Sequence, residues 1–347
     1  MPVRAGDRSR PIRRVTWPPD APRVGLHLGV ATGLLKAATR ARQIGCRALQ
    51  IFSDNPTAWR RRASLPRDVE AFIAYRERAR IDPLVVHASY LINLAGRAEP
   101  FARQSLAALI HELRRAPLYG ASIVNVHIGS HRHEGEEAGL AQIATNVRAA
   151  VAEAPDGVRL TLENSTGGGD ELGASLESIA RIVDLLGDAA DRVAFCLDTA
   201  HLWGAGYDLS SAEDATAIIE RFSALIGLDR LALIHLNDSK APLGSRWDRH
   251  EHVGAGRIGP AGLGALLRHP ALRETTFILE TPGVDEGYDA TNMRRARALF
   301  MGATALPKLP AAAFRLKRRS TRTFGRRRPA TVAAADQAVV RSIVVER

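Results

Sequence analysis

Residues 122–164 read SIVNVHIGSHRHEGEEAGLAQIATNVRAAVAEAPDGVRLTLEN. Two apolar runs, residues 122–129 and 158–164, stand on either side of residues 140–154, where apolar side chains recur with helical period. Near-continuous apolar strands separated by a helix are typical of a parallel sheet that is covered on both faces. This stretch therefore predicts a β-α-β unit.

The same unit recurs along most of the chain. Further strand-like runs occupy residues 24–29, 47–53, 83–89, 192–198, 231–237 and 275–281, with helix-period segments such as 33–45, 98–116 and 176–187 between them. Eight alternations of strand and helix predict an α/β fold of the (β/α)8 TIM-barrel type. An open doubly wound sheet is the alternative, but its site would gather at one switch point.

Metal-capable side chains end six successive strand-like runs, and three more follow closely. They are His87, His127, Glu163, Asp198, His235 and Glu280, followed by His201, Asp248 and His250. A TIM barrel brings the carboxyl ends of its strands to one face. Each residue alone is more often structural, but together, without a cation, they would leave several buried charges unpaired. The set predicts a metal centre with more than one ion.

Composition narrows the class of protein. The chain is 46% hydrophobic and 24% charged, and no apolar stretch is long enough for a membrane helix. The N-terminus has arginines but no apolar signal-peptide core, so we expect a soluble cytoplasmic protein. The two cysteines, Cys46 and Cys196, stand inside apolar runs and are expected to be buried thiols.

Positive charge is concentrated at the two ends of the chain. Of the formal net charge of +11, residues 1–22 carry +3 and residues 303–347 carry +9, which leaves about −1 for residues 23–302. We therefore expect a barrel domain over 23–302 with basic N- and C-terminal extensions, 1–22 and 303–347, that are disordered. Residues 308–328 could add affinity for phosphates or be dispensable.

Several segments together resemble one known family, the endonuclease IV family of zinc-dependent abasic-site endonucleases. They are HASYLINLAG (87–96), NVHIGSH (125–131), TLENSTGGG (161–169), CLDTAHLWGAGYD (196–208), HLNDSKAPLGSRWDRHEHVGAGRIG (235–259) and ILETPG (278–283). The resemblance covers about residues 24–300. It implies a TIM barrel with three zinc ions, Mn²⁺ being possible at some positions. The implied activity is incision of duplex DNA 5′ to an abasic site, leaving a 3′-hydroxyl and a 5′-deoxyribose phosphate, with 3′-end cleaning as a further activity.

The resemblance also implies roles for the metal-capable residues. His87 and His127 would hold one zinc, and Glu163 would bridge it to a second. Asp198, His235 and Glu280 would complete the second site, and His201, Asp248 and His250 would form the third. Glu163 would also act on the attacking water and is the expected catalytic residue.

The implied partner is damaged double-stranded DNA, bound by a monomer. Tyr90 and Leu91 match the family loop that inserts into the base stack. The loop over residues 54–62, with Trp59 and Arg60, is the second expected DNA contact, although Pro56-Thr57-Ala58 stands where the family commonly has longer polar side chains.

Two other functions remain open from the sequence. A two-metal sugar isomerase of the xylose-isomerase type would use Glu163, Asp198, His235 and Glu280, but it would not require the Asp248–His250 pair. A DNA-binding protein without activity could also keep the barrel, yet none of the bridging carboxylates is missing.

Overall fold

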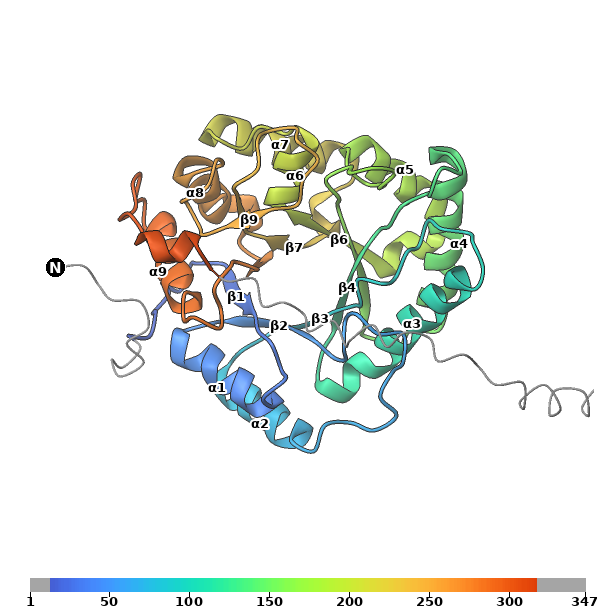
Figure 1. Ribbon diagram of the computed structural model, residues 1–347, viewed down its shortest axis with the longest axis horizontal. Helices are drawn as coiled ribbons and strands as arrows, with labels where there is room; N and C mark the ends of the chain where they lie inside the picture. The colour runs from blue at the N-terminus through green and yellow to red at the C-terminus, as the bar shows by residue number, and fades with distance from the viewer. Residues whose placement is uncertain (1–12, 317–347) are drawn as a thin grey trace, which may run out of the picture.

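Eight parallel strands close into a barrel in the computed structural model, which describes residues 13–316 (Figure 1). The strands are β1 Arg23–His27, β2 Ala48–Phe52, β3 Leu84–His87, β4 Ile123–His127, β5 Arg159–Glu163, β6 Val193–Asp198, β7 Leu231–His235 and β10 Thr276–Leu279. Their order around the barrel is β1-β10-β7-β6-β5-β4-β3-β2. Each overlaps one predicted run, and the predicted TIM barrel is confirmed.

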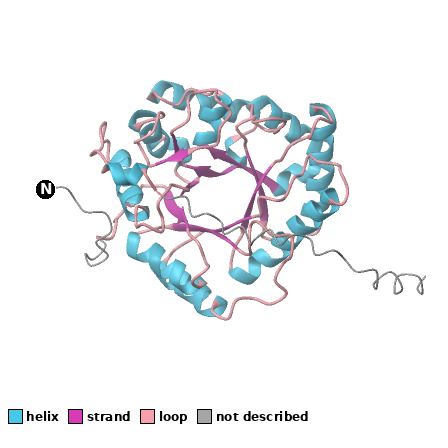
Figure 2. Ribbon diagram, in the orientation of Figure 1, coloured by secondary structure: helices cyan, strands magenta, loops and turns pink. Residues whose placement is uncertain are grey.

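Helices surround the barrel on its outer side (Figure 2). They are α1 Leu34–Ile44, α2 Val69–Ala79, α3 Phe101–Arg115, α4 Glu136–Ala152, α5 Leu176–Leu186, α6 Thr199–Ala205, α7 Ala212–Leu225, α8 Pro260–Arg268 and α9 Asp289–Phe300. Short 3₁₀ helices occupy η1 Ala116–Tyr119, η2 Gly187–Arg192, η3 Leu228–Arg230, η4 Pro270–Leu272 and η5 Ala311–Phe314, and a small antiparallel pair is formed by β8 Asp238–Ser239 and β9 His250–Glu251. No helix within residues 13–316 is both long and apolar enough to span a bilayer.

Alternation along the strands decides which side chains enter the barrel. Val85, Cys196 and Leu233 form a small apolar cluster. Each lies two residues before a predicted ligand, namely His87, Asp198 and His235. Because strand side chains repeat with period two, these ligands point to the same side as the apolar cluster, one layer nearer the carboxyl ends. Cys46 and Cys196 are buried free thiols, as predicted.

The first and last described stretches, residues 13–22 and 303–316, pack against the barrel. Val15 is buried, and its N–H donates to the carbonyl of Ile44 at 2.8 Å. Residues 303–316, here called the C-terminal strap, include the buried Ala313. The expected disorder is therefore not seen for 13–22 or 303–316, because apolar side chains in both stretches find partners on the barrel. Residues 1–12 and 317–347 lie outside the described part of the chain.

Candidate metal centre

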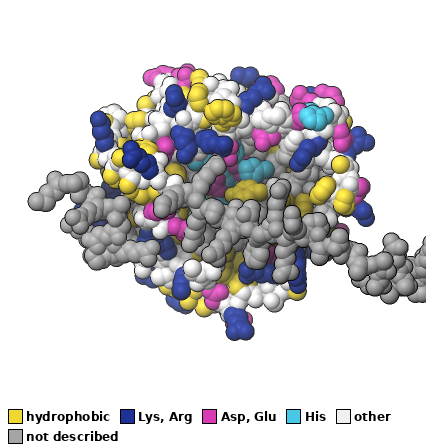
Figure 3. Space-filling view, in the orientation of Figure 1, with side chains coloured by type: hydrophobic (Ala, Val, Ile, Leu, Met, Phe, Trp, Pro, Cys, Tyr) yellow, Lys and Arg dark blue, Asp and Glu magenta, His cyan; other side chains and the backbone are white. Residues whose placement is uncertain are grey.

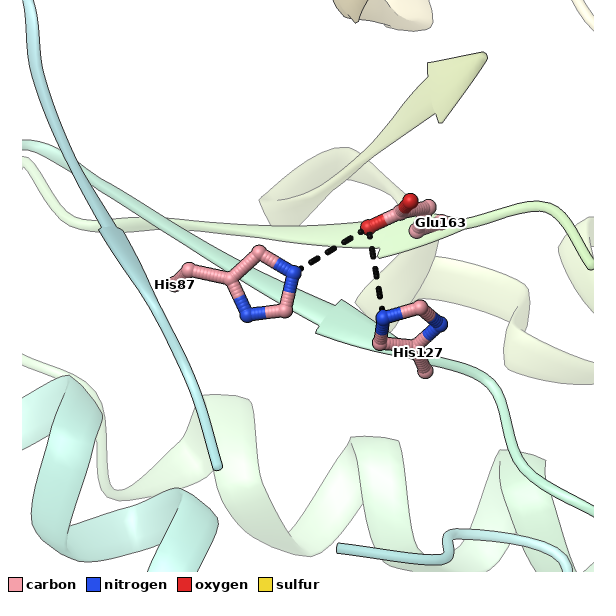
Figure 4. Close-up of side chains that lie close together, drawn as sticks. All are labelled: His87, His127 and Glu163. Carbon is pink, nitrogen blue, oxygen red and sulfur yellow. Dashed lines mark ion pairs between the residues drawn. The ribbon is translucent and has the colours of Figure 1, made fainter. Parts of the chain in front are cut away.

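The predicted ligands converge at the carboxyl ends of the strands. Register places His127 beside Glu163 and Asp198 beside His235. Figure 4 shows His87 and His127 turned toward one oxygen of Glu163 from neighbouring strands. Histidine and acidic side chains are visible near the middle of this face in Figure 3. The sequence-predicted set thus forms one cluster rather than several separate sites.

Distances within the cluster fit ligands that share cations. Glu163 Oε2 lies 3.4 Å from His87 Nε2 and 3.9 Å from His127 Nε2. Its other oxygen, Oε1, lies 3.2 Å from His235 Nδ1. Ligand atoms about 2.0–2.2 Å from one tetrahedral zinc lie roughly 3.3–3.6 Å apart. The two oxygens of Glu163 therefore face two separate nitrogen sets, as a bridging carboxylate does.

Three groups of histidines and carboxylates among the described residues could each hold an ion. They are His87, His127 and Glu163; Glu163, Asp198, His235 and Glu280; and Asp198, His201 and His250. A fourth group, Glu163, Cys196 and His235, shares two residues with the second. Asp248 adjoins the third group, with its oxygens 3.5 Å from His201 Nε2 and 3.1 Å from His250 Nε2. All nine predicted ligands are thus brought together.

Hydrogen bonds select the histidine nitrogen that faces the cluster. Nδ1 of His87 donates to the carbonyl of Ala88 at 2.8 Å, and Nδ1 of His201 donates to the carbonyl of Asn164 at 2.9 Å. His250 does the same toward the carbonyl of Glu280 at 2.9 Å. In the neutral form of each ring the lone pair is then on Nε2. Such bonds fix ligand tautomers at metal sites. The buried Nε2 of His250 has no hydrogen-bond partner among the described residues, which suits a metal ligand.

Asp198 shows how local folding places two ligands at once. Its Oδ1 accepts hydrogen bonds from the N–H groups of Ala200 and His201, at 2.7 and 3.0 Å, and so caps the first turn of α6. The cap brings His201 back toward the strand end. Oδ2 of Asp198 remains directed at the cluster, 3.4 Å from His250 Nε2.

Electrostatics show that the cluster attracts positive charge. Burial opposes ionisation of Glu163, but His127 and His235 hold the pKa of its carboxyl well below the usual value. Burial also opposes charge on His201, yet Asp198 and Asp248 raise the pKa of His201 to about 10. With no other cation, protons on the imidazoles balance the carboxylates. Divalent ions can take the place of those protons, so the donor set fits a metal centre.

Buried amides that the sequence prediction missed hold the ligand carboxylates in place. Nδ2 of Asn125 donates to Glu163 Oε2 at 2.6 Å, and Nδ2 of Asn237 donates to Asp198 Oδ2 at 2.7 Å. Gln50 links two ligands, because its Nε2 donates to Glu280 at 2.6 Å and its Oε1 accepts from His235 Nε2 at 3.0 Å. In the sequence, Gln50 and Asn125 could have been noticed as polar residues inside apolar strands, and Asn237 as a polar residue two positions after His235.

Replacing Gln50 with leucine is expected to lower zinc affinity roughly 10- to 100-fold, because both Glu280 and His235 lose the group that orients them. Competition with a chelator of known affinity measures the change. Thr161→Val is the matched control, since Thr161 is fully buried in β5 and its hydroxyl has no partner among the described residues. Equal affinities of the two variants would contradict the role of Gln50.

The four predicted DNA contacts differ in exposure, and Tyr90 is the one that lies against a predicted metal ligand among the described residues. Tyr90 is 56% exposed, and its ring centroid lies 5.6 Å from that of His87. Leu91 and Trp59 are half-buried, Arg60 is exposed, and the Trp59 ring lies 6.4 Å from that of Phe101. Tyr90 is therefore both accessible to a ligand and in contact with the metal centre.

Arg61 differs from the exposed arginines on either side of it. Only 10% of its side chain is exposed, and its Nη1 lies 3.5 Å from Glu112 Oε1 in α3. Arg61 therefore faces the outer helices, whereas Arg60 and Arg62 are exposed. The guanidinium of Arg61 ties the loop after β2 to a helix.

Histidines left out of the ligand set have other partners. His27 Nδ1 lies 3.1 Å from Glu280 Oε1, so this imidazole supports a predicted ligand. His133 is 92% exposed and pairs with Asp170 at 2.8 Å. His252 is buried and contacts the C-terminal strap.

Comparison with known proteins gives one consistent result. A family model described as "Xylose isomerase-like TIM barrel" matches residues 38–301. "Probable endonuclease 4" of Natranaerobius thermophilus is 38% identical over 79% of this chain and 96% of its own length. The protein of the same name from Methanoculleus marisnigri is 40% identical over 80% and 98%.

Solved structures agree with the sequence comparisons. Endonuclease IV from Thermus thermophilus superposes with a TM-score of 0.70 at 40% identity, covering 81% of this chain and 100% of the other. A D-tagatose 3-epimerase-like protein superposes with a TM-score of 0.58 at 17% identity, over 80% and 97%. The second similarity shows the shared fold alone.

Proposed function

Since this chain belongs to the endonuclease IV family and is therefore a DNA-cleaving hydrolase, we propose that it cuts duplex DNA on the 5′ side of abasic sites. The proposed products are a 3′-hydroxyl and a 5′-deoxyribose phosphate. Cleaning of blocked 3′ ends is a second proposed activity of the same site. One observation carries the proposal. A third ligand group, Asp198, His201 and His250, lies beside the two groups that share Glu163.

The third group separates the nuclease from the sugar isomerase. A two-metal isomerase would use Glu163, Asp198, His235 and Glu280, and these four residues do form one group. It has no need for His201, Asp248 and His250, whose side chains nevertheless meet at 3.1–3.5 Å. During attack on a phosphodiester, negative charge builds up on the attacking, leaving and non-bridging oxygens, and cations held by a third group would offer one more contact for that charge.

We assign three zinc ions to the nine ligands, with Mn²⁺ able to replace zinc at the carboxylate-rich positions. When bound, the ions would neutralise the phosphate and lower the pKa of an attacking water. Glu163 is buried and its two oxygens face two of the ligand groups, so it can orient that water. The imidazoles bind through fixed tautomers and stay neutral.

Further assignments extend the proposal to the whole chain. The barrel over residues 23–302 is the catalytic domain, flanked by basic extensions, and the protein acts as a monomer in the cytoplasm. Damaged double-stranded DNA is its partner, contacted through Tyr90, Leu91, Trp59 and Arg60.

The direct test is a duplex with one tetrahydrofuran abasic analogue, incubated with metal-loaded protein. We expect one cut 5′ to the analogue and a 3′ end that a polymerase can extend. The undamaged duplex serves as control. An intact analogue strand at stoichiometric protein, combined with isomerisation of a sugar, would transfer the assignment to the isomerase.

Tyr90→Ala is expected to weaken binding of the abasic duplex roughly tenfold, since one stacked base contributes about 1–3 kcal/mol. Binding of undamaged duplex should change little, and Tyr90→Phe should behave like the parent because it keeps the ring. Fluorescence anisotropy gives both affinities. If Tyr90 only packs its loop, Tyr90→Ala will instead lower metal content and Tm and leave the preference for abasic DNA intact.

A further inference from the structure

The loop after β7 presents an exposed tryptophan at the edge of the metal centre. Trp247 is 61% exposed, the highest value among the large apolar side chains of residues 13–316. It directly precedes Asp248, whose Oδ1 lies 3.1 Å from His250 Nε2. A single exposed apolar side chain needs no explanation by itself, so the surroundings of Trp247 decide what it means.

The backbone that carries Trp247 is held in place on two sides. The N–H of Arg246 donates to the carbonyl of Gly204 in α6 at 2.9 Å, and the carbonyl of Arg246 accepts from Thr166 Oγ1 at 3.2 Å. Figure 1 shows this loop beside α6. Arg246 also has a φ of +58°, a conformation that costs about 1 kcal/mol or more for a residue with a side chain. The tryptophan is therefore presented by a fixed, strained backbone rather than by a loose loop.

Glycine allows the loop after β7 to approach the loop after β5. A Cβ on Gly168 would stand 3.0 Å from the carbonyl oxygen of Arg246, which is tighter than an ordinary contact. Gly168 lies in the run Gly167-Gly168-Gly169. One use of this run is thus to let the backbone before Trp247 pack closely beside the metal centre.

Charge near Trp247 fits a nucleic acid. Arg246 and Arg249 are exposed, and so is Lys240 at the start of the same loop. The one acidic residue in residues 240–249 is Asp248, which is a predicted metal ligand. Phosphates pair with such basic side chains, and the face of a base stacks on an aromatic ring. A nucleotide offers both groups at once, whereas an apolar protein surface would use the ring alone.

Trp247 and Tyr90 approach the metal centre from different strands. The ring of Tyr90 lies 5.1 Å from that of Phe52 in β2 and 5.9 Å from that of His127 in β4. The carbonyl oxygen of Trp247 would stand 3.5 Å from a Cβ on Gly204, in the helix after β6. The two aromatic side chains are therefore placed to contact different nucleotides.

We propose that Trp247 stacks on a base next to the abasic position of the bound DNA. The proposal rests on the proposed function, because it takes damaged duplex as the ligand. In an intact duplex both faces of each base are covered by its neighbours, and loss of one base uncovers the face of the next. The indole can stack on that uncovered face alone, so Trp247 contributes to recognition of damage rather than to general affinity for DNA.

The test uses Trp247→Ala and Trp247→Phe in the full-length, metal-loaded Glu163→Gln protein, which keeps the DNA uncut. Met301→Ala is the matched control, because Met301 is 55% exposed and lines a cleft with Pro22, just before β1, at the amino ends of the strands. Anisotropy of labelled DNA gives the affinities for a tetrahydrofuran duplex and for undamaged duplex. Tryptophan fluorescence is recorded in the same titrations.

We expect Trp247→Ala to bind abasic duplex about tenfold more weakly, the loss that one stacked base produces, and to bind undamaged duplex within about twofold of the parent. Trp247→Phe keeps a ring and should keep most of the affinity, but its fluorescence should be quenched less by abasic duplex. Met301→Ala should match the parent throughout. Tyr90→Ala and Trp247→Ala combined should weaken binding about a hundredfold, because separate contacts add in free energy.

Parent-like affinity of Trp247→Ala for abasic duplex would overturn the proposal. Equal losses for the two duplexes would also overturn it, by making Trp247 a general DNA contact. So would a loss of bound metal or of Tm, which would make it a packing residue, or a change in oligomeric state without a change in DNA affinity. Incision by the protein with Glu163 intact is measured separately. Failure to cut abasic duplex removes the proposed function, whereas normal cutting with parent-like affinity of Trp247→Ala removes this inference alone.

Discussion

Glu163→Gln is expected to reduce incision of abasic duplex about a thousandfold or more, which corresponds to about 4 kcal/mol at the transition state. The amide keeps the shape of the side chain but loses its negative charge, and only one of its two ends can accept a hydrogen bond or bind a cation. Single-turnover cleavage with excess protein measures the chemical step directly. Binding of the abasic duplex should stay within a fewfold of the parent.

The control for this variant is Glu153→Gln. Glu153 directly follows α4, is exposed and pairs with Arg114 of α3 in the outer layer of helices. The Glu153→Gln protein should cleave abasic duplex at the parent rate. If Glu163→Gln cleaved normally, Glu163 would have no part in the reaction. If it lost metal completely, its effect would belong to metal binding rather than to the attacking water.

Removing the metal should reduce incision at least as much as Glu163→Gln does. Chelation is expected to abolish incision and to lower Tm by at least about 5 °C, because each ion present at about a thousandfold above its Kd stabilises the folded state by about 4 kcal/mol. Without cations the carboxylates of Glu163, Asp198 and Glu280 are balanced only by protons on histidines. Adding zinc back should restore both activity and Tm, with saturation at three ions per chain.

Histidine variants test the count of ions. His250→Ala should bind two zinc ions and lose most of its activity, since His250 belongs to the third ligand group. His133→Ala should bind three, because His133 is exposed and pairs only with Asp170 among the described residues. Elemental analysis after gel filtration gives both numbers. A parent protein that saturates at two ions would contradict the trinuclear assignment.

The barrel and its ligands were predictable because both follow from short-range patterns. Strand side chains alternate, and a parallel barrel collects the carboxyl ends of all strands, so the ends of six of the eight apolar runs could be grouped as one candidate metal centre from the sequence. Helix α4 was expected from residue 140 but begins at Glu136, where acidic residues in the first turn favour an earlier start.

Features that depend on distant partners were not predictable. The loop residue Arg61 lies against Glu112 of α3, and an arginine between two other arginines gives no sign of this in the sequence. Gln50 and Asn125 could equally have been read as isolated polar residues in strands. The strap has prolines and small residues without periodicity, and it takes its position from His252 and Arg295.

The bonds from histidine Nδ1 atoms to main-chain carbonyls also govern how fast an ion can leave. The rings of His87, His201 and His250 cannot swing outward unless those bonds break, and the carbonyls belong to residues at the ends of strands or directly after them. Release of an ion therefore requires a local opening of the barrel rim. The residence time of zinc should follow the hydrogen-exchange lifetime of the amides around that rim, so a slow chelation rate would report backbone motion rather than ligand strength.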